Sequence, residues 1–421
     1  MHDTRYDVAV IGAGIAGLAA ARTLIDVGHS VILIEARDRV GGRILTARDP
    51  WTDLPIELGA EFVHGCPPEL LDLIREAGLT LFERTGESIC YENGKLGDCG
   101  FFSEAFDVLE DLPASPDVPF SEFLAQKHLS EHIAARAKGY VEGFNAAGAN
   151  RIGTAALRKQ QQAEHEIGGD RTSFRITEGY DRLAAHLLDR FIAAGGESHL
   201  NTPVTTITWH SGEVRIATSN PDTPEVHAAR AVITVPLGVL QSSSFRISPE
   251  PHDSIIAARK LAMGSATRIT LIFRERFWEQ ISPNISFLFA QQRVPPTWWT
   301  AAPNPSPTLT GWVAGPRALR VSTGTALKDQ ALVTLGTVFD RNDLPALLTS
   351  FHTHDWQSDP FSLGAYSYAP AGALNASDHL AIPVENTLYF AGEHTDTTGH
   401  WGTVHAALHS GLRAAAQILE K

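Results

Sequence analysis

The sequence is poor in cysteine and in basic residues, and both shortages limit what the protein can be. Its 421 residues include three cysteines, Cys66, Cys90 and Cys99, and none of them forms a Cys-x-x-Cys pair. An odd, scattered set argues against a disulfide framework and against a thiolate zinc site, and we predict neither. Lysine and arginine number 34 against 48 acidic residues, which gives a formal net charge of −14. Because nucleic-acid binding needs clustered basic residues, we expect no nucleic-acid partner.

Long apolar runs are also missing. No uninterrupted apolar stretch approaches the length of about 20 residues that crosses a bilayer. The polar N-terminal residues lead almost at once into the first predicted strand, without the pattern of a signal or transit peptide. We therefore expect a soluble, cytoplasmic protein without a membrane partner. The apolar fraction of 43% is ordinary for a globular chain, and the length is sufficient for two domains.

The stretch Tyr6–Arg43 carries the strongest motif. An apolar strand runs into Gly12-Ala-Gly14-Ile-Ala-Gly17, an alanine-rich helix follows, and a second apolar strand ends at Glu35. Gly12 permits a tight turn, Gly14 lets a pyrophosphate approach the backbone, and Gly17 lets helix and strand pack closely. The helix N-terminus favours phosphates, and the carboxylate of Glu35 can accept hydrogen bonds from a ribose. This order of strand, turn, helix and strand predicts a dinucleotide site for NAD or FAD.

The residues from Glu35 to Arg43 favour FAD. Their sequence, Glu-Ala-Arg-Asp-Arg-Val-Gly-Gly-Arg, resembles a signature of the flavin-dependent amine oxidase family, which includes monoamine oxidases, polyamine oxidases, flavin-type histone demethylases and L-amino-acid oxidases. The resemblance implies that this segment folds over the FAD diphosphate, with Arg43 at a phosphate and Arg37 near the adenosine. It covers nearly the whole chain and is strongest at 6–65 and 356–412.

The resemblance also implies a set of cofactor contacts. It puts Gly59 and Ala60 against the flavin ring, Val204 at the adenine, and the start of the last helix, at Thr403, near flavin N1 and O2. Ala365 stands where monoamine oxidases carry the cysteine bonded to the flavin, and a methyl group cannot form that thioether, so we expect non-covalent FAD. The implied cofactor-binding residues are Gly12, Gly14, Ala16, Gly17, Glu35, Ala36, Arg37, Gly42, Arg43, Gly59, Ala60, Glu61, Val204, Trp356, Gly392, Glu393, Thr403 and Val404.

Four residues are implied to shape the substrate pocket. His64 ends a segment similar to polyamine oxidases, in which the histidine faces the cavity; the alternative is a hydrogen-bonded structural histidine. Tyr366 matches one wall of an aromatic cage around the amine, and Trp401 is the candidate for the other wall, because Thr403 replaces the second tyrosine. Arg268 stands where many members carry a lysine that holds a water at flavin N5. Since arginine is effectively never deprotonated, Arg268 cannot act as a neutral base, which leaves a carboxylate anchor, a water anchor or a strand-surface residue.

Two further features carry weaker predictions. His405 and His409 are one helical turn apart, as in a metal pair, but no third ligand motif accompanies them, so we predict no metal site. The run Gln160–Glu166 is expected to form a solvated helix face, with Glu164 or Glu166 as the members that could reach a cavity.

These motifs together predict an α/β fold. We expect a Rossmann-type FAD-binding domain, built on the GxGxxG βαβ unit, with an inserted α+β substrate domain. The proline-rich stretch 295–307 predicts a loop. The FAD-binding domain is expected to be discontinuous, and the expected boundaries are 1–80, 200–240 and 350–421 for this domain and 81–199 and 241–349 for the substrate-binding domain.

By resemblance, the function is the oxidation of a small-molecule amine. A hydride passes from the carbon beside an uncharged amine nitrogen to flavin N5, the imine hydrolyses to an aldehyde, and O2 is reduced to H2O2. Two alternatives keep the fold: an L-amino-acid oxidase, in which Arg268 would bind the carboxylate, and a desaturase-type flavin oxidoreductase, which the modest hydrophobicity disfavours. A third is a non-enzymatic flavin-binding module. The sequence leaves open which amine is oxidised and the oligomeric state.

Overall fold

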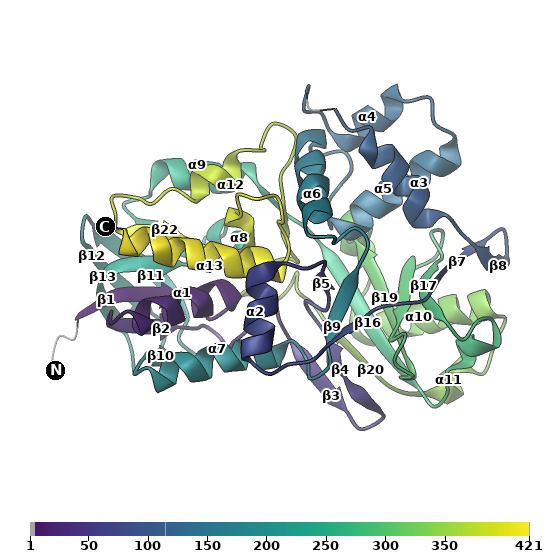
Figure 1. The fold of residues 1–421 in the computed structure, drawn as a ribbon, viewed down its shortest axis with the longest axis horizontal. Helices are drawn as coiled ribbons and strands as arrows, with labels where there is room; N and C mark the ends of the chain where they lie inside the picture. Colours follow the sequence, from purple (N-terminus) through teal and green to yellow (C-terminus); the bar gives the residue numbers. More distant parts are fainter. Residues whose placement is uncertain (1–4, 114, 421) are drawn as a thin grey trace.

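Two β-sheets organise the structure, a computed structural model that describes residues 5–113 and 115–420 (Figure 1). The larger sheet has eight strands in the order β10-β2-β1-β13-β12-β11-β14, with β22 beside β13. The smaller has seven strands in the order β20-β16-β19-β18-β17-β7-β8. The strands of the larger sheet are β1 (Arg5–Ile11), β2 (Val31–Ile34), β10 (Glu197–His199), β11 (Val204–His210), β12 (Glu213–Thr218), β13 (Glu225–Ile233), β14 (Arg246–Ser248) and β22 (Leu388–Phe390). Those of the smaller sheet are β7 (Glu87–Glu92), β8 (Lys95–Asp98), β16 (Ala266–Phe273), β17 (Ile285–Phe289), β18 (Thr297–Thr300), β19 (Thr308–Ala314) and β20 (Leu348–His354).

The predicted strand–turn–helix–strand unit forms the centre of the larger sheet. β1 pairs in parallel with both β2 and β13, and α1 (Ile15–Asp26) begins directly after the glycine turn. Gly12 has a φ of +101°, and a Cβ on Gly17 would lie 1.9 Å from the carbonyl oxygen of Gly12. Only glycine fits these two positions without strain or overlap. The predicted Rossmann-type α/β fold is confirmed.

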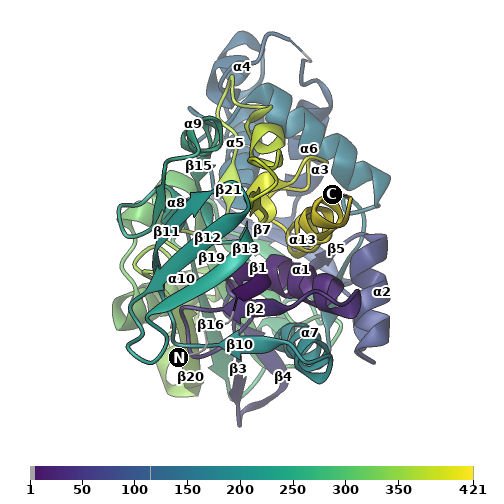
Figure 2. The same ribbon diagram turned by 90° about the vertical axis from the view of Figure 1, so that its left-hand side faces the viewer.

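Helices cover both faces of the larger sheet. Successive residues of β1 point to opposite faces, so this strand contributes to the packing on each side. Val8 and Val10 pack into the cluster that contains α1, α7 (Asp181–Ala193) and α13 (Val404–Leu419). Ala9 and Ile11 pack into a second cluster, which includes α8 (Leu237–Leu240), α9 (His252–Lys260) and α12 (Ala376–Leu380). Figure 2 shows α1, α7 and α13 together on one side of the sheet.

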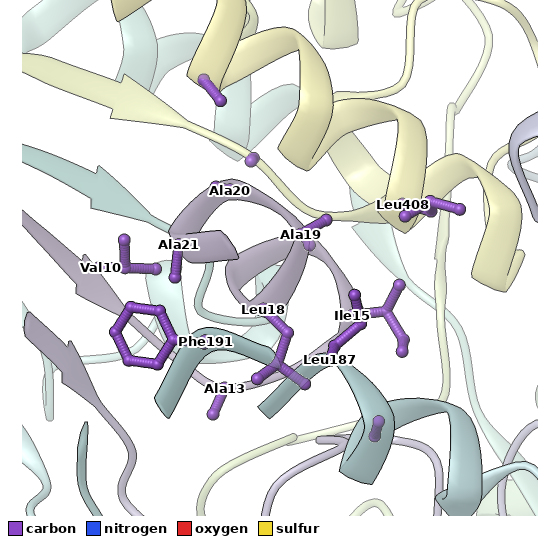
Figure 3. Packing of buried hydrophobic residues seen from close by; sticks show 14 of the residues in the cluster. Val10, Ala13, Ile15, Leu18, Ala19, Ala20, Ala21, Leu187, Phe191 and Leu408 are labelled. Atoms are coloured by element: carbon purple, nitrogen blue, oxygen red, sulfur yellow. The ribbon is translucent and has the colours of Figure 1, made fainter. Parts of the chain in front are cut away.

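Small side chains let α1 lie close to its neighbours. Figure 3 shows Ala19 and Ala20 of α1 near α13, which contributes Leu408, while Phe191 of α7 reaches the same cluster. A Cβ added to Gly411 of α13 would lie only 2.1 Å from the carbonyl oxygen of Ala16. This close contact packs the middle of α13 against the first turn of α1.

In the smaller sheet β16 lies next to the edge strand β20, and all eight of its residues are buried. It pairs in antiparallel fashion with β19 and β20. One face is covered by α10 (Gly324–Phe339) and α11 (Leu344–Leu347), through residues such as Leu327 and Leu335. In Figure 1 a group of helices lies above this sheet, and its members are α3 (Phe101–Glu110), α4 (Phe120–Gln126), α5 (Glu131–Phe144) and α6 (Thr154–Glu166).

The remaining elements are short and connect the two parts. They are β3 (Thr46–Asp49), β4 (Thr52–Glu57), β5 (Val63–His64), β6 (Leu81–Glu83), β9 (Ser173–Ile176), β15 (Ala262–Met263), β21 (Ser367–Tyr368), α2 (Pro68–Glu76) and the 3₁₀ turns η1 (Phe277–Gln280), η2 (Gly315–Arg320) and η3 (Glu393–Thr395). None of the helices in the described ranges combines the length and hydrophobicity of a transmembrane span.

The strand pairing differs from the expected domain boundaries at three strands. β10, from the segment 81–199, pairs with β2, and β14, from the segment 241–349, pairs with β11, so both belong to the larger sheet. β20 crosses position 350 and pairs with β16 in the smaller sheet. β10 and β14 have three residues each and β20 has seven. None of them carries a motif of its own, so only the tertiary pairing reveals which sheet they join.

Two local features also differ from expectation. The stretch 295–307 is not wholly a loop, because Thr297–Thr300 form β18 between β17 and β19. Its two tryptophans and β-branched residues suit a pleated surface, and the neighbouring prolines only limit its length. Cys90 and Cys99 form a disulfide although the cysteine count suggested no framework: the hairpin of β7 and β8 brings their Cα atoms to 5.3 Å. Cys66 is free and exposed.

Candidate active site

Residues of both sheets line a cavity of about 1140 Å³. On the side of the larger sheet it is lined by the glycine turn and by Glu35, and on the side of the smaller sheet by Arg268 and Trp299. Every predicted cofactor-binding residue except Gly17 lines it, and so do all four predicted catalytic residues. Gly17 packs against Gly12 instead, as its predicted role in helix packing requires.

The end of the cavity at β1 and β2 fits a dinucleotide. Gly14 has no protein atom within 4 Å of the place where a Cβ would stand, so its backbone is open to a phosphate. The Glu35 carboxylate is buried, and its two oxygens accept backbone N–H groups of Ala13 at 2.7 Å and Arg37 at 2.9 Å. Each oxygen keeps a second lone-pair direction for a ribose hydroxyl. Burial raises the pKa of Glu35, although these hydrogen bonds and nearby arginines oppose the rise.

Arg37 is held by a partner that sequence reasoning missed. Its guanidinium makes two hydrogen bonds to Asp359, at 2.7 and 2.8 Å, and lies over the ring of Trp356. His354 contacts the same carboxylate at 2.9 Å. Asp359 stands three residues after Trp356 in a segment already singled out, but an aspartate there gives no signal of its own. The pairing fixes Arg37 at the cavity wall.

Arg43 and Glu393 join three distant segments. Arg43 Nη1 donates to Glu393 Oε1 at 2.8 Å and to the carbonyl of Ala365 at 2.9 Å. The second carboxylate oxygen of Glu393 accepts from the Ser367 hydroxyl at 2.6 Å and from the Gly402 N–H at 3.0 Å. Burial raises the pKa of Glu393, but Arg43 and the hydrogen bonds outweigh this effect and hold the pKa below its usual range. The charge is therefore retained in a buried place.

The start of α13 lies at the cavity. Thr403 caps this helix by accepting the N–H of Ala406 at 3.1 Å, and both Thr403 and Val404 line the cavity. A helix N-terminus carries partial positive charge, which suits an electron-rich group of a bound cofactor. The rings of Tyr366 and Trp401 also line the cavity. Their polar atoms are fixed, because Tyr366 donates to a backbone carbonyl at 2.6 Å and Trp401 to another at 2.8 Å.

Arg268 lies in the cavity wall but is already paired. Its Nη2 is 2.7 Å from Oε2 of Glu61, and its Nη1 donates to the Gly59 carbonyl at 3.1 Å. Arg175 lies 3.2 Å from the other oxygen of Glu61, and the Trp299 indole donates to the same carboxylate at 3.2 Å. Burial raises the pKa of Glu61, yet the two arginines outweigh it and lower the pKa overall. Glu61 therefore stays ionised and balances Arg268, which is not a mere strand-surface residue.

Arg84 is a second cation of the cavity, and the sequence offered no signal for it. It lies partly buried between the rings of Phe62 and Phe287, with its guanidinium carbon 4.7 and 4.3 Å from the ring centroids, and donates to the Ser286 hydroxyl at 2.9 Å. Among the described residues no carboxylate lies within ion-pair distance of it. Burial lowers its pKa to about 10, so Arg84 remains charged at neutral pH.

His64 and Glu164 lie together at another part of the cavity wall. The ring of His64 meets the rings of Phe62 and Phe144 edge to face, and burial lowers its pKa. Glu164 is 6% exposed and lines the cavity, so the expected solvated helix face is wrong at this position and the alternative, that Glu164 reaches a cavity, is confirmed. α6 packs its inner side against the loop 167–172 and against His64, a tertiary contact that the charge pattern cannot reveal.

His405 and His409, which are one helical turn apart, contact different residues. His409 lies 3.6 Å from Asp396, which raises the pKa of its imidazole. His405 turns instead toward His400 and Glu164, and burial lowers its pKa to about 3. The sequence could not reveal this grouping, because Glu164 is far away in the chain.

Comparison with known proteins gives the family. The model of the flavin containing amine oxidoreductases matches residues 15–175 and 136–419, and the chain belongs to this family. "Polyamine oxidase 4" of Oryza sativa subsp. japonica is 30% identical over 455 residues, 98% of this chain and 88% of that protein. "Polyamine oxidase 2" of Arabidopsis thaliana is 30% identical over 97% of this chain and 87% of that protein.

Solved structures agree in fold. Putrescine oxidase bound to putrescine superposes with a TM-score of 0.85 at 22% identity, covering 99% of this chain and 100% of that one. Cyclohexylamine oxidase from Brevibacterium oxydans IH-35A gives a TM-score of 0.83 at 22% identity, covering 99% of both chains. The protein is thus a flavin-dependent amine oxidoreductase, and its cofactor is FAD, held without a covalent bond. Ala365, which lines the cavity, agrees with this mode of binding.

Proposed function

We propose that the enzyme oxidises a small-molecule amine at the carbon beside its nitrogen, within the part of the cavity lined by Tyr366, Trp401 and His64. The observation that carries the proposal is that these side chains share one cavity with the residues that fit the cofactor. Flavin bound in this cavity would supply the redox chemistry: it would take a hydride from that carbon and pass the two electrons to O2, which would give an imine and H2O2. The imine then hydrolyses in water to the aldehyde.

The residues of the chain contribute mainly by orienting the amine and excluding water. The hydroxyl of Tyr366 and the indole N–H of Trp401 are both tied to backbone carbonyls, so their rings form rigid walls. The amine must be uncharged to release a hydride. Because burial lowers the pKa of His64, this ring is neutral at pH 7 and its charge does not interfere with the amine.

Arg268 acts in this proposal by positioning its neighbours. It is paired with Glu61 and donates to the Gly59 carbonyl, so it holds the segment that passes the flavin. A guanidinium is effectively never deprotonated, and no proton is removed from the amine by this residue.

A second candidate is an amine that also carries a carboxylate, such as an L-amino acid. Arg84 favours it, because this cation lines the cavity and is balanced by no carboxylate within ion-pair distance in the part of the chain that the structure describes. Arg268 does not favour it, since Glu61 already occupies its guanidinium. Substitution Arg84→Met would then raise the KM for an amino acid at least tenfold, while the KM for an amine without a carboxylate changes little.

The experiment that tests the function is anaerobic reduction of the holoenzyme, read as loss of the oxidised flavin absorbance. The relatives are named for polyamines and putrescine, so putrescine and spermidine come first, followed by benzylamine, tyramine and L-amino acids. We expect one class to bleach the flavin and admission of air to restore it with release of H2O2. Bleaching by none of them would refute amine oxidation.

The location is part of the same proposal. We propose a cytoplasmic location. The disulfide between Cys90 and Cys99 is unusual for that compartment, where thiols are kept reduced.

A further inference from the structure

Three side chains with metal-binding atoms meet beside the cavity. Glu164 comes from α6, His400 from the loop before α13, and His405 from the first turn of α13. One ligating atom from each lies within 4.8 Å of the other two. Glu164 and His405 are more than nine-tenths buried, with exposed fractions of 6% and 8%. The rings of His400 and His405 have their centroids 4.7 Å apart.

The polar atoms of this group have no hydrogen-bond partner within the described residues. They are both carboxylate oxygens of Glu164, Nδ1 of His400 and Nε2 of His405, all inaccessible to solvent. The shortest recorded approach, from His400 Nδ1 to Glu164 Oε1, is 3.9 Å, which is too long for a hydrogen bond. A buried carboxylate without compensation is costly, so this arrangement calls for a cation between the three side chains.

The side chains are held in place by the surrounding fold. Asp396, which is buried, accepts the backbone N–H groups of Thr398 at 3.0 Å, Gly399 at 2.8 Å and His400 at 3.0 Å through one carboxylate oxygen. This fixes the loop that presents His400. His405 follows the Thr403 cap of α13, so its backbone is helical and rigid. Donors from three well-ordered segments can therefore converge with little loss of conformational freedom.

We propose that Glu164, His400 and His405 bind one divalent transition-metal ion of the Zn²⁺ type. Two imidazoles and one carboxylate are a donor set that proteins use for Zn²⁺, with a fourth position left for water. Metal–ligand distances of about 2.0–2.2 Å require the three side chains to move inward by roughly 1 Å. The ion would neutralise the buried carboxylate of Glu164. This inference stands apart from the proposed amine reaction.

A substrate ammonium group is the competing cation, and the lining of the cavity argues against it. Of the three residues only Glu164 lines the cavity, whereas His400 and His405 do not. An ammonium group entering from the cavity would meet the carboxylate and leave both imidazole nitrogens unpaired. A metal ion uses all three.

The test is Zn²⁺ binding to the holoenzyme. The protein is first stripped with a chelator, then dialysed to equilibrium against buffered free Zn²⁺, and the metal is counted per bound FAD. We expect one Zn²⁺ per chain, with the affinity reduced at least about a hundredfold by each of Glu164→Gln, His400→Asn and His405→Asn. The matched control is His165→Asn, which removes an exposed histidine of the same helix and should leave the affinity unchanged.

The variants are compared only when their FAD content and metal-free melting temperature match the wild type. Of the three substitutions, His400→Asn is expected to disturb folding least, because His400 is only partly buried. Less than one tenth of an equivalent bound to the wild type, or binding that survives all three substitutions, would overturn the proposal. So would a Glu164→Gln enzyme that binds no less Zn²⁺ but shows a raised KM for a diamine and not for a monoamine, which is the signature of an ammonium subsite.

Discussion

Arg268 and Glu61 form a buried ion pair in the cavity wall, with Nη2 and Oε2 2.7 Å apart and side-chain exposures of 4% and 3%. Arg175 shares the same carboxylate at 3.2 Å, so one anion balances two buried cations. The charge of Arg268 is therefore compensated within the protein. The effect of substituting Glu61, Arg268 or Arg175 therefore depends on the charges that remain in the group.

The first prediction concerns the loss of the anion. Glu61→Gln leaves Arg268 and Arg175 facing each other without a counter-charge, and removing one partner of a buried pair typically costs about 3–5 kcal/mol. We expect the free energy of unfolding of the FAD-saturated enzyme to fall by about 3 kcal/mol, measured by denaturant titration.

An exposed ion pair serves as a control, because it shows how much stability is lost when a carboxylate is removed from a pair that is not buried. Glu250 and Arg259 form an exposed ion pair at 3.2 Å, and Glu250→Gln should change the stability by less than about 1 kcal/mol. Equal effects of the two substitutions would mean that the Glu61 group contributes no more than a surface pair does.

The second prediction compares two glycines of the same turn. Gly14 has a φ of −72°, which alanine adopts freely, and no protein atom lies near its missing Cβ. Gly14→Ala should leave the melting temperature of the apoprotein unchanged but weaken FAD binding at least tenfold, because the methyl group occupies space that a phosphate needs. Titration of apoprotein with FAD, followed by protein fluorescence, measures the affinity.

Gly17→Ala should behave differently. The added Cβ would lie 1.9 Å from the Gly12 carbonyl oxygen, so the apoprotein itself is expected to lose several degrees of melting temperature or fail to fold. Unchanged FAD affinity in Gly14→Ala would show that the phosphates do not pass this glycine.

The dinucleotide end of the site could be predicted from sequence because its requirements are local. One short strand–turn–helix–strand unit contains the turn at Gly12, the close packing at Gly17 and the carboxylate of Glu35. Within such a unit the spacing along the sequence determines where each residue lies in the structure. The resemblance extended this to Arg43, Glu393 and other lining residues, although it did not reveal that these two side chains pair with each other.

The substrate side could not be predicted in the same way. Arg84, Arg175 and Glu164 are distant in the sequence from Phe62, Glu61 and His64, which they approach only through tertiary packing. None of them has neighbours that form a motif, and a charged residue on a helix or strand is usually solvated. The proline-rich segment 295–307 likewise contains a strand, β18, that its sequence did not predict, because the neighbouring strands β17 and β19 supply the pairing.

The third prediction is a thiol count. If Cys90 and Cys99 are bridged, the denatured protein prepared without reductant presents one thiol, that of Cys66, and three after reduction. A thiol reagent read by absorbance gives both numbers. Three thiols without reductant would contradict the bridge and remove the objection to a cytoplasmic location.

The last prediction is a pH dependence that comes from His394. Burial lowers its pKa to about 4, although Glu393 opposes the shift, whereas an unfolded histidine titrates near 6.5. Because the folded pKa is depressed, the unfolded chain binds the proton first, and stability is lost as the pH falls from about 6.5 toward 4. The loss should approach about 3 kcal/mol. We expect His394→Gln to reduce the slope of stability against pH by nearly one proton in this window when FAD is saturating. A His394→Gln enzyme that keeps the wild-type slope would refute the assignment.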